Sequence, residues 1–277
     1  MKERRKFNTD ELMKMLEKVS ISLKRTVSCT LIGGLAMMYH GAKETTKDID
    51  MVFSKGKEIE HFIHTVSKMG FSPNPGLTED YLDLKAHAIY ISDDGYMLDL
   101  FLSRVLNGFY LTDNMKKRSK TIHLEGNLEV KVLSPVDIFL FKSITLREDD
   151  LLDMAYLAPM IKDWVALENE LLFMRHDYRL LSRFNERMKD LETQYQLEVP
   201  ITSDIENLCK MAYVKMAILG VLQNEPRDKT SIFQGLDEGE VQDLERALKE
   251  LVNDGIIFDR DGMVSMKHHP AGKRISS

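Results

Sequence analysis

Two aspartates that are two residues apart, Asp48 and Asp50, could together bind divalent cations. Side chains of a strand alternate between its two faces, so these carboxylates would share one face while Ile49 and Met51 enter the core. Two residues along a strand span about 6.6 Å, a separation from which both carboxylates can converge on a pair of Mg²⁺ ions. This arrangement is typical of phosphoryl transfer.

Two glycines come before the aspartates. The apolar segment 28–32 predicts a strand that ends at Gly33 and Gly34, and thirteen residues separate Gly34 from Asp48. Glycine tolerates positive φ and lets a ligand approach the backbone closely. A short helix over 35–40 would follow, and the N–H groups of a helix start attract phosphate oxygens. A nucleoside triphosphate could therefore lie between the glycines and the carboxylates.

A third carboxylate, Asp99, is predicted on a neighbouring strand. Segments 81–92 and 96–103 have strand patterns and are joined by Asp93-Asp94-Gly95, a strong hairpin turn signal. Asp99 is the polar residue within the apolar run 97–101. An acid in a buried strand is destabilising unless it is paired or bound to a metal, so Asp99 is a candidate site residue.

These residues resemble the nucleotidyltransferase superfamily of the DNA polymerase β type. Its signature is a hydrophobic residue, Gly, and Gly or Ser, followed after a gap by Asp, a hydrophobic residue, Asp or Glu, and a hydrophobic residue. Ile32-Gly33-Gly34 and Asp48-Ile49-Asp50-Met51 match this signature. The resemblance covers residues 27–157 and is closest to the minimal nucleotidyltransferases and the AbiEii-type toxin enzymes. It implies an α+β fold with a mixed sheet.

The resemblance also implies roles for the residues. Asp48, Asp50 and Asp99 would be the catalytic carboxylates and would bind two Mg²⁺ ions, with an NTP as the substrate. Gly33 and Gly34 would contact the nucleotide phosphates.

Two further nucleotide-binding residues are implied. Thr46 lies two residues before the first aspartate, as in many of these enzymes, although Glu44 stands where many have Arg. A helix that opens at Ser134-Pro135 carries a Lys, Arg and Asp pattern, in which Lys142 would contact phosphate. The pattern continues as Arg147, Asp150 and Asp153. Asp150 and Asp153 are expected to be structural partners of nearby basic groups.

We expect three regions: a nucleotidyltransferase domain over 1–158, a helical connector over 159–202 and a winged-helix-like domain over 203–277. The last region has patterns for three helices and a hairpin. The stretch 236–254, which includes its third helix, carries seven acids and two bases, and phosphate would be repelled by it. Protein docking or dimerisation is therefore a better prediction for this domain than DNA binding.

The composition fits a soluble globular protein, with 43% hydrophobic and 30% charged residues. A formal charge of −6 argues against broad, charge-driven binding of nucleic acid. No apolar run approaches the length of about 18 residues that a membrane span needs. The basic N-terminus leads into an amphipathic helix that starts near Asn8, not into a signal-peptide core. We therefore expect a cytoplasmic protein without a membrane segment.

The sequence predicts an Mg²⁺-dependent nucleotidyltransferase that moves an NMP from an NTP to a hydroxyl. The acceptor could be an RNA such as tRNA, a protein or a small molecule, and the enzyme could be the toxin of a toxin–antitoxin pair. The alternative is a non-catalytic nucleotide-sensing regulator that acts through the winged helix. The three carboxylates argue against this alternative, because clustered acids are destabilising without a metal.

Overall fold

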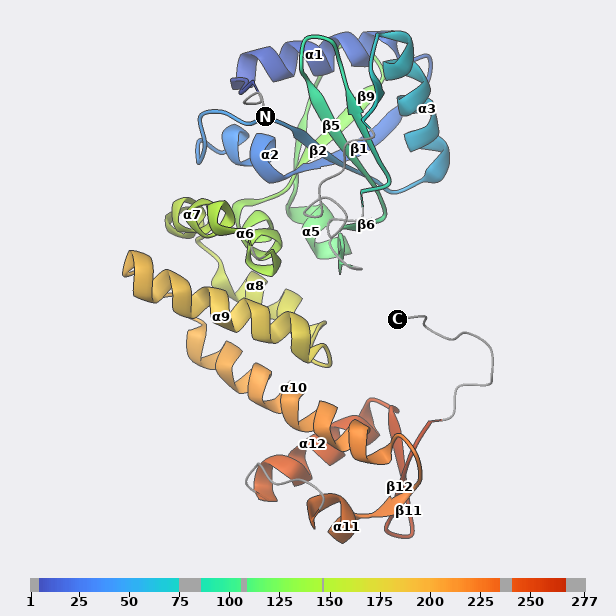
Figure 1. Ribbon diagram of the computed structural model, residues 1–277, viewed down its shortest axis with the longest axis vertical. Helices are drawn as coiled ribbons and strands as arrows, with labels where there is room; N and C mark the ends of the chain where they lie inside the picture. Colours follow the sequence, from blue (N-terminus) through green and yellow to red (C-terminus); the bar gives the residue numbers. More distant parts are fainter. Residues whose placement is uncertain (1–4, 75–85, 106–108, 146, 235–240, 268–277) are drawn as a thin grey trace. The chain divides into compact units, whose positions relative to one another are not determined.

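The computed structural model describes residues 5–74, 86–105, 109–145, 147–234 and 241–267 (Figure 1). The chain forms two compact units. The first contains residues 1–167 and 187–199, and the second contains residues 168–186 and 200–277. Residues 159–202, the expected connector, are thus divided between the two units.

A seven-stranded mixed sheet forms the centre of the first unit, with the strand order β3-β4-β5-β2-β1-β9-β8. β2 is parallel to β5 and β1 is parallel to β9, while the other neighbours are antiparallel. The strands are β1 (Val27–Ile32), β2 (Ile49–Phe53), β3 (Ser72–Pro73), β4 (Ala88–Ile91), β5 (Met97–Leu102), β8 (Lys120–Ile122) and β9 (Leu128–Val132). β6 (Arg104–Val105) and β7 (Phe109–Tyr110) form a separate small pair.

The predicted hairpin between β4 and β5 is confirmed. The two strands pair in antiparallel register, and Gly95 takes the positive φ of +88° that its turn needs. Residues 81–85, which belong to the first predicted strand, lie outside the described residues.

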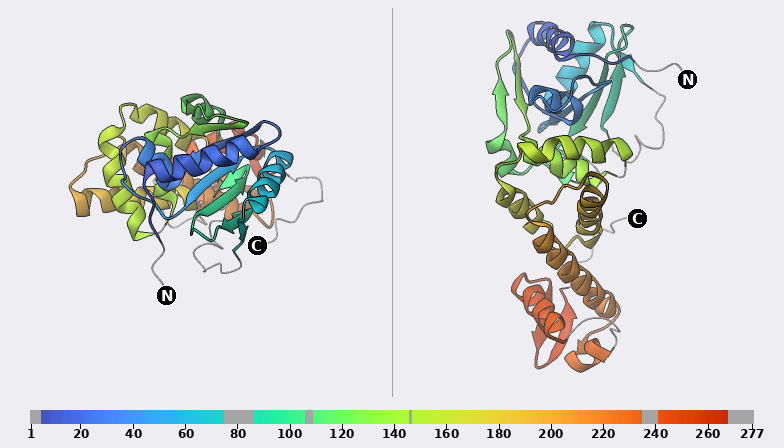
Figure 2. Two further views of the ribbon diagram at one scale, coloured as in Figure 1. Left: turned by 90° about the horizontal axis from the view of Figure 1, so that it is seen from above. Right: turned by 90° about the vertical axis from the view of Figure 1, so that its left-hand side faces the viewer.

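α1 (Thr9–Ser22) and α3 (Gly56–Lys68) lie against one face of this sheet (Figures 1 and 2). α1 begins as predicted, because the Asn8 side chain accepts a hydrogen bond from the Glu11 N–H and the Glu11 carboxylate accepts one from the Asn8 N–H, both at 3.0 Å. The ring of Phe62 in α3 packs against that of Phe53 in β2, with centroids 5.1 Å apart. Phe53 therefore faces α3, and by alternation Asp50 points to the opposite face of the sheet.

The structure describes further helices in this part of the chain. They are α2 (Gly33–Tyr39), α5 (Asp113–Arg118), α6 (Pro135–Ile144), α7 (Glu148–Leu157), a 3₁₀ turn (Ala158–Met160), α8 (Trp164–Leu172) and α9 (Tyr178–Tyr195). α8 and α9 each contribute residues to both units.

The predicted single helix through Lys142 and Asp153 is wrong: the segment forms two helices, α6 and α7. Thr145 ends α6 in an extended conformation, with φ −80° and ψ 154°, and its hydroxyl donates to the carbonyl of Lys142 at 2.8 Å. A β-branched residue whose side chain competes for backbone hydrogen bonds favours such an end.

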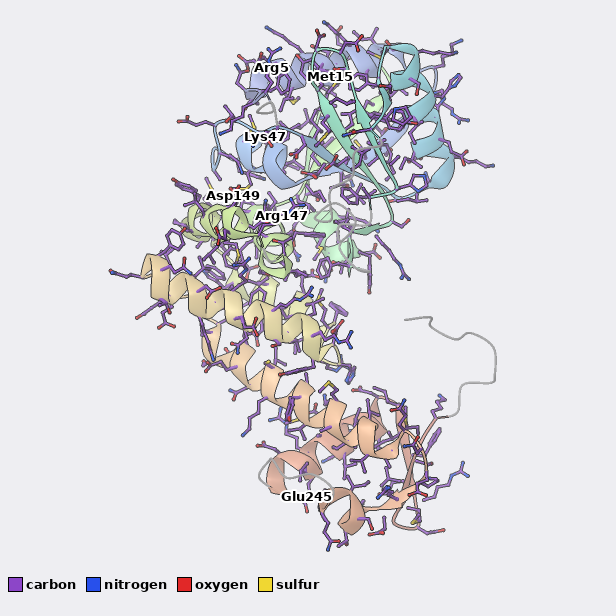
Figure 3. The ribbon with its side chains drawn as sticks, viewed as in Figure 1. Arg5, Met15, Lys47, Arg147, Asp149 and Glu245 are labelled. Carbon is purple, nitrogen blue, oxygen red and sulfur yellow. The ribbon has the colours of Figure 1, made fainter. Side chains whose placement is uncertain are left out.

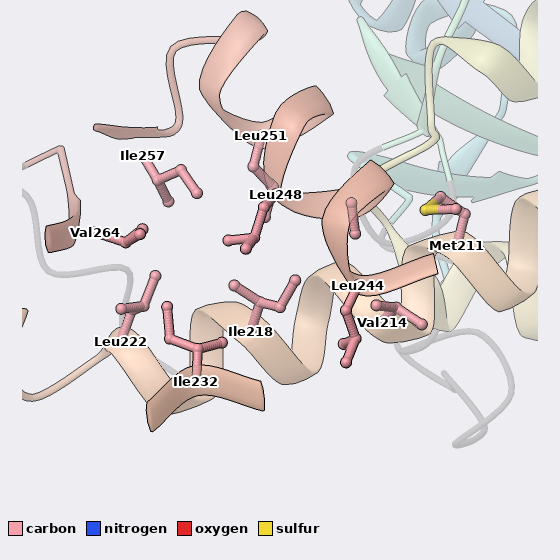
Figure 4. Close-up of a cluster of buried hydrophobic side chains, with 11 residues drawn as sticks. Met211, Val214, Ile218, Leu222, Ile232, Leu244, Leu248, Leu251, Ile257 and Val264 are labelled. Carbon is pink, nitrogen blue, oxygen red and sulfur yellow. The ribbon is translucent and has the colours of Figure 1, made fainter. Parts of the chain in front are cut away.

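Three helices and a three-stranded antiparallel sheet, in the order β10-β12-β11, form most of the second unit. The elements are α10 (Thr202–Leu222), β10 (Arg227–Asp228), α11 (Lys229–Gln234), α12 (Val241–Asn253), β11 (Ile257–Arg260) and β12 (Met263–Met266). Their apolar faces share one core, in which Ile218, Ile232 and Leu251 are fully buried (Figure 4). The predicted elements are present, and their assignment as a winged helix stays a prediction.

Two predictions about the rest of the molecule can be compared with the structure. In the described part of the chain, no helix is long and apolar enough to cross a membrane. Three of the seven acids predicted for the third helix, Asp237, Glu238 and Glu240, lie outside the described residues.

Candidate active site

Two of the predicted carboxylates are cross-strand neighbours. Asp50 on β2 is in direct register with Asp99 on the parallel strand β5. Adjacent strands lie about 4.8 Å apart, and directly paired residues share a face, so both side chains emerge side by side. Asp99 is 1% exposed and Asp50 is half-buried. Asp48, just before β2, is also half-buried. The sheet therefore brings Asp50 and Asp99 to one face.

Gly33 makes room for the Asp50 carboxylate. It is the first residue of α2 and has a φ of +63°. A Cβ atom built at this position would lie 2.0 Å from Oδ2 of Asp50, closer than non-bonded atoms can approach. Both the backbone conformation and the missing side chain therefore require glycine here. The predicted glycine and the predicted carboxylate form one local structure.

Thr46 occupies the space beside the second glycine. A Cβ atom at Gly34 would lie 2.3 Å from the Thr46 hydroxyl oxygen, so this hydroxyl fills the place that a side chain at position 34 would take. The same hydroxyl donates to Oδ1 of Asp48 at 3.2 Å. Thr46 therefore orients the first carboxylate.

The N-terminal segment holds Thr46 in place, which the sequence did not indicate. The backbones of Phe7 and Thr46 exchange two hydrogen bonds, at 2.9 and 3.1 Å. Phe7 is fully buried and its ring stacks on Tyr96 at 4.3 Å. A contact between positions 39 residues apart in sequence (46 − 7) leaves no local signal.

The electrostatics of Asp50 favour a bound cation. Burial and the neighbouring charge of Asp48 raise the pKa of Asp50 to about 7, although Lys142 and Arg147 act to lower it. Two carboxylates that repel each other retain a proton at neutral pH unless a positive charge joins them.

Lys142 is embedded in a network of acids. Its ammonium group binds Asp150 and lies 2.8 Å from Oδ2 of Asp153. Lys43 also binds Asp153, at 2.8 and 3.0 Å. Although burial acts to lower the pKa of Lys142, the two aspartates outweigh it and raise this pKa. The expectation that Asp150 and Asp153 are partners of basic groups is confirmed.

Arg147 is a cation near the carboxylates that the set of predicted site residues left out. It is exposed at the start of α7 (Figure 3). Its charge acts to lower the pKa of Asp50. Its place in the Lys, Arg and Asp pattern was a signal. What could not be seen in the sequence was the break before α7, which decides where Arg147 lies.

The carboxylates of the site offer oxygen ligands of the kind that Mg²⁺ binds. Among the described residues, no three His, Cys, Asp or Glu side chains are gathered closely enough to hold an ion by themselves. Mg²⁺ commonly binds one or two carboxylates and takes its other ligands from water and substrate phosphates. The oxygen ligands of Asp48 and Asp50, with the space that Gly33 leaves beside them, agree with that type of site.

Comparison with known proteins identifies the first unit. Among curated proteins, none matches the chain. A protein-family model matches residues 7–198, from the Phe7 anchor to the end of the first unit. This match spans more than half of the sequence, and the chain belongs to the family described as nucleotidyltransferase of unknown function (DUF6036).

Proposed function

We propose that the protein is an Mg²⁺-dependent enzyme that transfers an NMP from an NTP to a hydroxyl group of an acceptor. The observation that carries this proposal is the register of Asp50 with Asp99 on one sheet face, next to a glycine that leaves room for the Asp50 carboxylate. Family membership alone gives the general class, whereas this arrangement supports the metal and the reaction type.

In the proposed reaction the bond between the α-phosphorus and pyrophosphate breaks, and a bond from the acceptor oxygen to that phosphorus forms. Asp48 and Asp50 would hold the metal, and Asp99 would help to accept the proton of the attacking hydroxyl. Bound Mg²⁺ would supply charge neutralisation for the phosphates and for the leaving pyrophosphate.

Phosphate binding is assigned to the glycine turn and to Arg147. Gly33 lies beside the Asp50 carboxylate and Gly34 beside the Thr46 hydroxyl, while Arg147 is an exposed cation whose charge acts to lower the pKa of Asp50. Lys142 would act from inside the protein, because two aspartates already bind its ammonium group. Thr46 would contribute by orienting Asp48.

The acceptor is an RNA, a protein or a small molecule, and we place the reaction in the cytoplasm. The resemblance to AbiEii-type enzymes supports a toxin-type activity, and the elements of the second unit support a winged helix. That unit would serve protein docking or dimerisation.

The test is a transfer assay with the full-length protein. Each α-³²P-labelled NTP is incubated with Mg²⁺, total RNA and cell extract, and the products are separated on gels. Label should enter one acceptor class with the wild-type protein and with Asp94→Asn, an exposed turn acid that serves as a control. Asp48→Asn and Asp99→Asn should abolish transfer.

Two outcomes would change the proposal. Full transfer by Asp48→Asn would remove this carboxylate from the mechanism. No transfer to any acceptor, with NTP binding intact, would favour the non-catalytic regulator.

A further inference from the structure

Arg187, in the second half of α9, directs a buried guanidinium group at the turn between α6 and α7. Its side chain is 10% exposed. Nε and Nη2 donate to the carbonyl oxygen of Thr145 at 3.1 and 3.0 Å, and Nη2 also donates to the carbonyl oxygen of Arg147 at 2.8 Å. One side chain therefore binds both ends of the turn.

These contacts are suited to arginine. A planar guanidinium can donate to two acceptors in a fixed geometry, which an ammonium group on a flexible stem cannot reproduce. The Thr145 carbonyl lies at the C-terminus of α6, where a positive charge is favoured by the helix dipole. Nη1 of Arg187 lies 3.6 Å from Oδ2 of Asp190, whose side chain is about half exposed. The two carbonyl oxygens are therefore closer partners of the guanidinium than this carboxylate.

The turn that Arg187 binds brings Lys142 into contact with Asp150. Lys142 and Asp150 are eight residues apart, and in an unbroken helix they would be separated by about 12 Å along the axis. They are in direct contact because the turn folds α7 back against α6. The Thr145 hydroxyl also donates to Asp150, which ties the turn to the same ion pair.

The same turn places Arg147. This residue is the N-cap of α7, so the direction in which its side chain leaves the backbone is set where Arg187 holds its carbonyl. Arg147 is exposed, and its charge acts to lower the pKa of Asp50. A shift of the turn would therefore move a cation relative to the carboxylates.

We infer that Arg187 is a positioning residue for nucleotide binding: it fixes the backbone at Thr145 and Arg147 and thereby holds Arg147 where the phosphates of the NTP bind. This inference rests on the proposed function. It agrees with the place of residues 187–199 in the first unit and with a family match that includes Arg187.

The test measures NTP binding by the full-length protein with isothermal titration calorimetry. The four NTPs are titrated in the presence of Mg²⁺, and the one that binds most tightly to the wild type is used for the variants. Arg187→Met should weaken binding roughly tenfold, and Arg187→Lys about threefold, since an ammonium can replace only part of the bonding. Arg183→Met, at a half-buried arginine one turn earlier in α9, is the matched control and should bind as the wild type does.

A double-mutant cycle separates positioning from general loss of structure. If Arg187 acts through Arg147, the loss caused by Arg187→Met should largely disappear in the Arg147→Met background. A loss of the same size in both backgrounds would overturn the inference. Should Arg187→Met fail to fold, Arg187→Lys takes its place in the cycle.

The two proposals fail in different ways. Wild-type protein that binds none of the four NTPs would overturn the proposed function, and this inference with it. Tight binding by the wild type that Arg187→Met leaves unchanged would overturn the inference alone.

Discussion

At the scale of single residues, the candidate site depends on the lack of a side chain at positions 33 and 34 as much as on the polar groups beside them. The Asp50 carboxylate occupies the space where a side chain at position 33 would be, and the Thr46 hydroxyl occupies that space at position 34. Because positions 33 and 34 are both glycine, the Asp50 carboxylate and the Thr46 hydroxyl can lie where any other residue would place its Cβ atom.

Gly33→Ala should remove activity while the fold is retained. The new Cβ would lie 2.0 Å from Oδ2 of Asp50, so the carboxylate has to move. A displacement of that size lowers activity by roughly 100-fold, and the positive φ adds about 1–2 kcal/mol of destabilisation. Gly56→Ala is the control, because nothing lies within 4 Å of its added Cβ and φ is not positive. Transfer assays and thermal melts of both variants measure the effect; equal activity would contradict this account.

The pH dependence of stability should reveal Asp50. Burial and Asp48 raise its pKa to about 7 in the folded chain, whereas the unfolded value is about 3.9. Between these values the folded state keeps a proton that the unfolded state releases. The contribution of Asp50 to the free energy of unfolding therefore falls as pH rises from about 4 to 7.

Asp50→Asn removes this penalty and provides the measurement. In EDTA, the melting temperature of the variant minus that of the wild type should increase between about pH 5 and pH 8, reaching roughly 4 °C. Added Mg²⁺ at the higher pH should stabilise the wild type more than the variant, because the cation replaces the proton. A melting-temperature difference that is constant over this range would show that Asp50 titrates normally.

At the scale of elements, the turn between α6 and α7 decides what Lys142 does. The ammonium group binds two aspartates from α7, so its first effect is on packing of the two helices. A lysine whose main contact was nucleotide phosphate would instead leave the free protein almost unchanged when replaced.

Lys142→Met should therefore destabilise the protein even without nucleotide. The variant leaves the Asp150 and Asp153 carboxylates nearly buried with less compensation, at about 2–4 kcal/mol. Lys43→Met should have a smaller effect, because the Lys43 side chain is 32% exposed. Urea denaturation of the two variants gives the comparison. An unchanged urea midpoint for Lys142→Met would contradict this account and support Lys142 as a phosphate contact.

The elements also show how far the sequence could predict the site. Local patterns were sufficient for the strand that carries Asp50, the hairpin that presents Asp99 and the start of α1 at Asn8. The break after α6 was not predicted: Thr145 is a local signal for a helix end, but the hydrogen bonds that Arg187 donates at the break come from α9. Asp150 and Asp153 were predicted to pair with basic groups, but the choice of Lys142 and the position of Arg147 could not be predicted, because they depend on how α7 packs against α6.

At the scale of the whole molecule, the nucleotidyltransferase unit is built from two separate parts of the chain. Residues 187–199 return to it after a segment that belongs to the second unit. Patterns along the sequence placed the domain end at residue 158, because helices of both units follow without a break in composition. Only tertiary contacts assign the second half of α9.

The charges of the second unit lead to a prediction about DNA. In the described part of α12 and the residue after it, Asp243 binds Lys210, Glu250 binds Lys215 and Arg246, and Asp254 binds Arg175. These ion pairs occupy several of the acids and bases of the second unit. The described part of α12 therefore has no net positive charge, and we expect no affinity for duplex DNA.

The measurement is a mobility-shift assay with the full-length protein and a 30-base-pair duplex of mixed sequence at low salt. Non-specific DNA-binding proteins reach dissociation constants of about 10⁻⁶ to 10⁻⁴ M, so the absence of a shift at about 10 µM protein is the expected result. A shift that disappears at higher salt would show cationic contacts to phosphate and would contradict this prediction. A shift that is abolished by added NTP would go further, since it would couple the two units and favour the nucleotide-sensing regulator over the transferase.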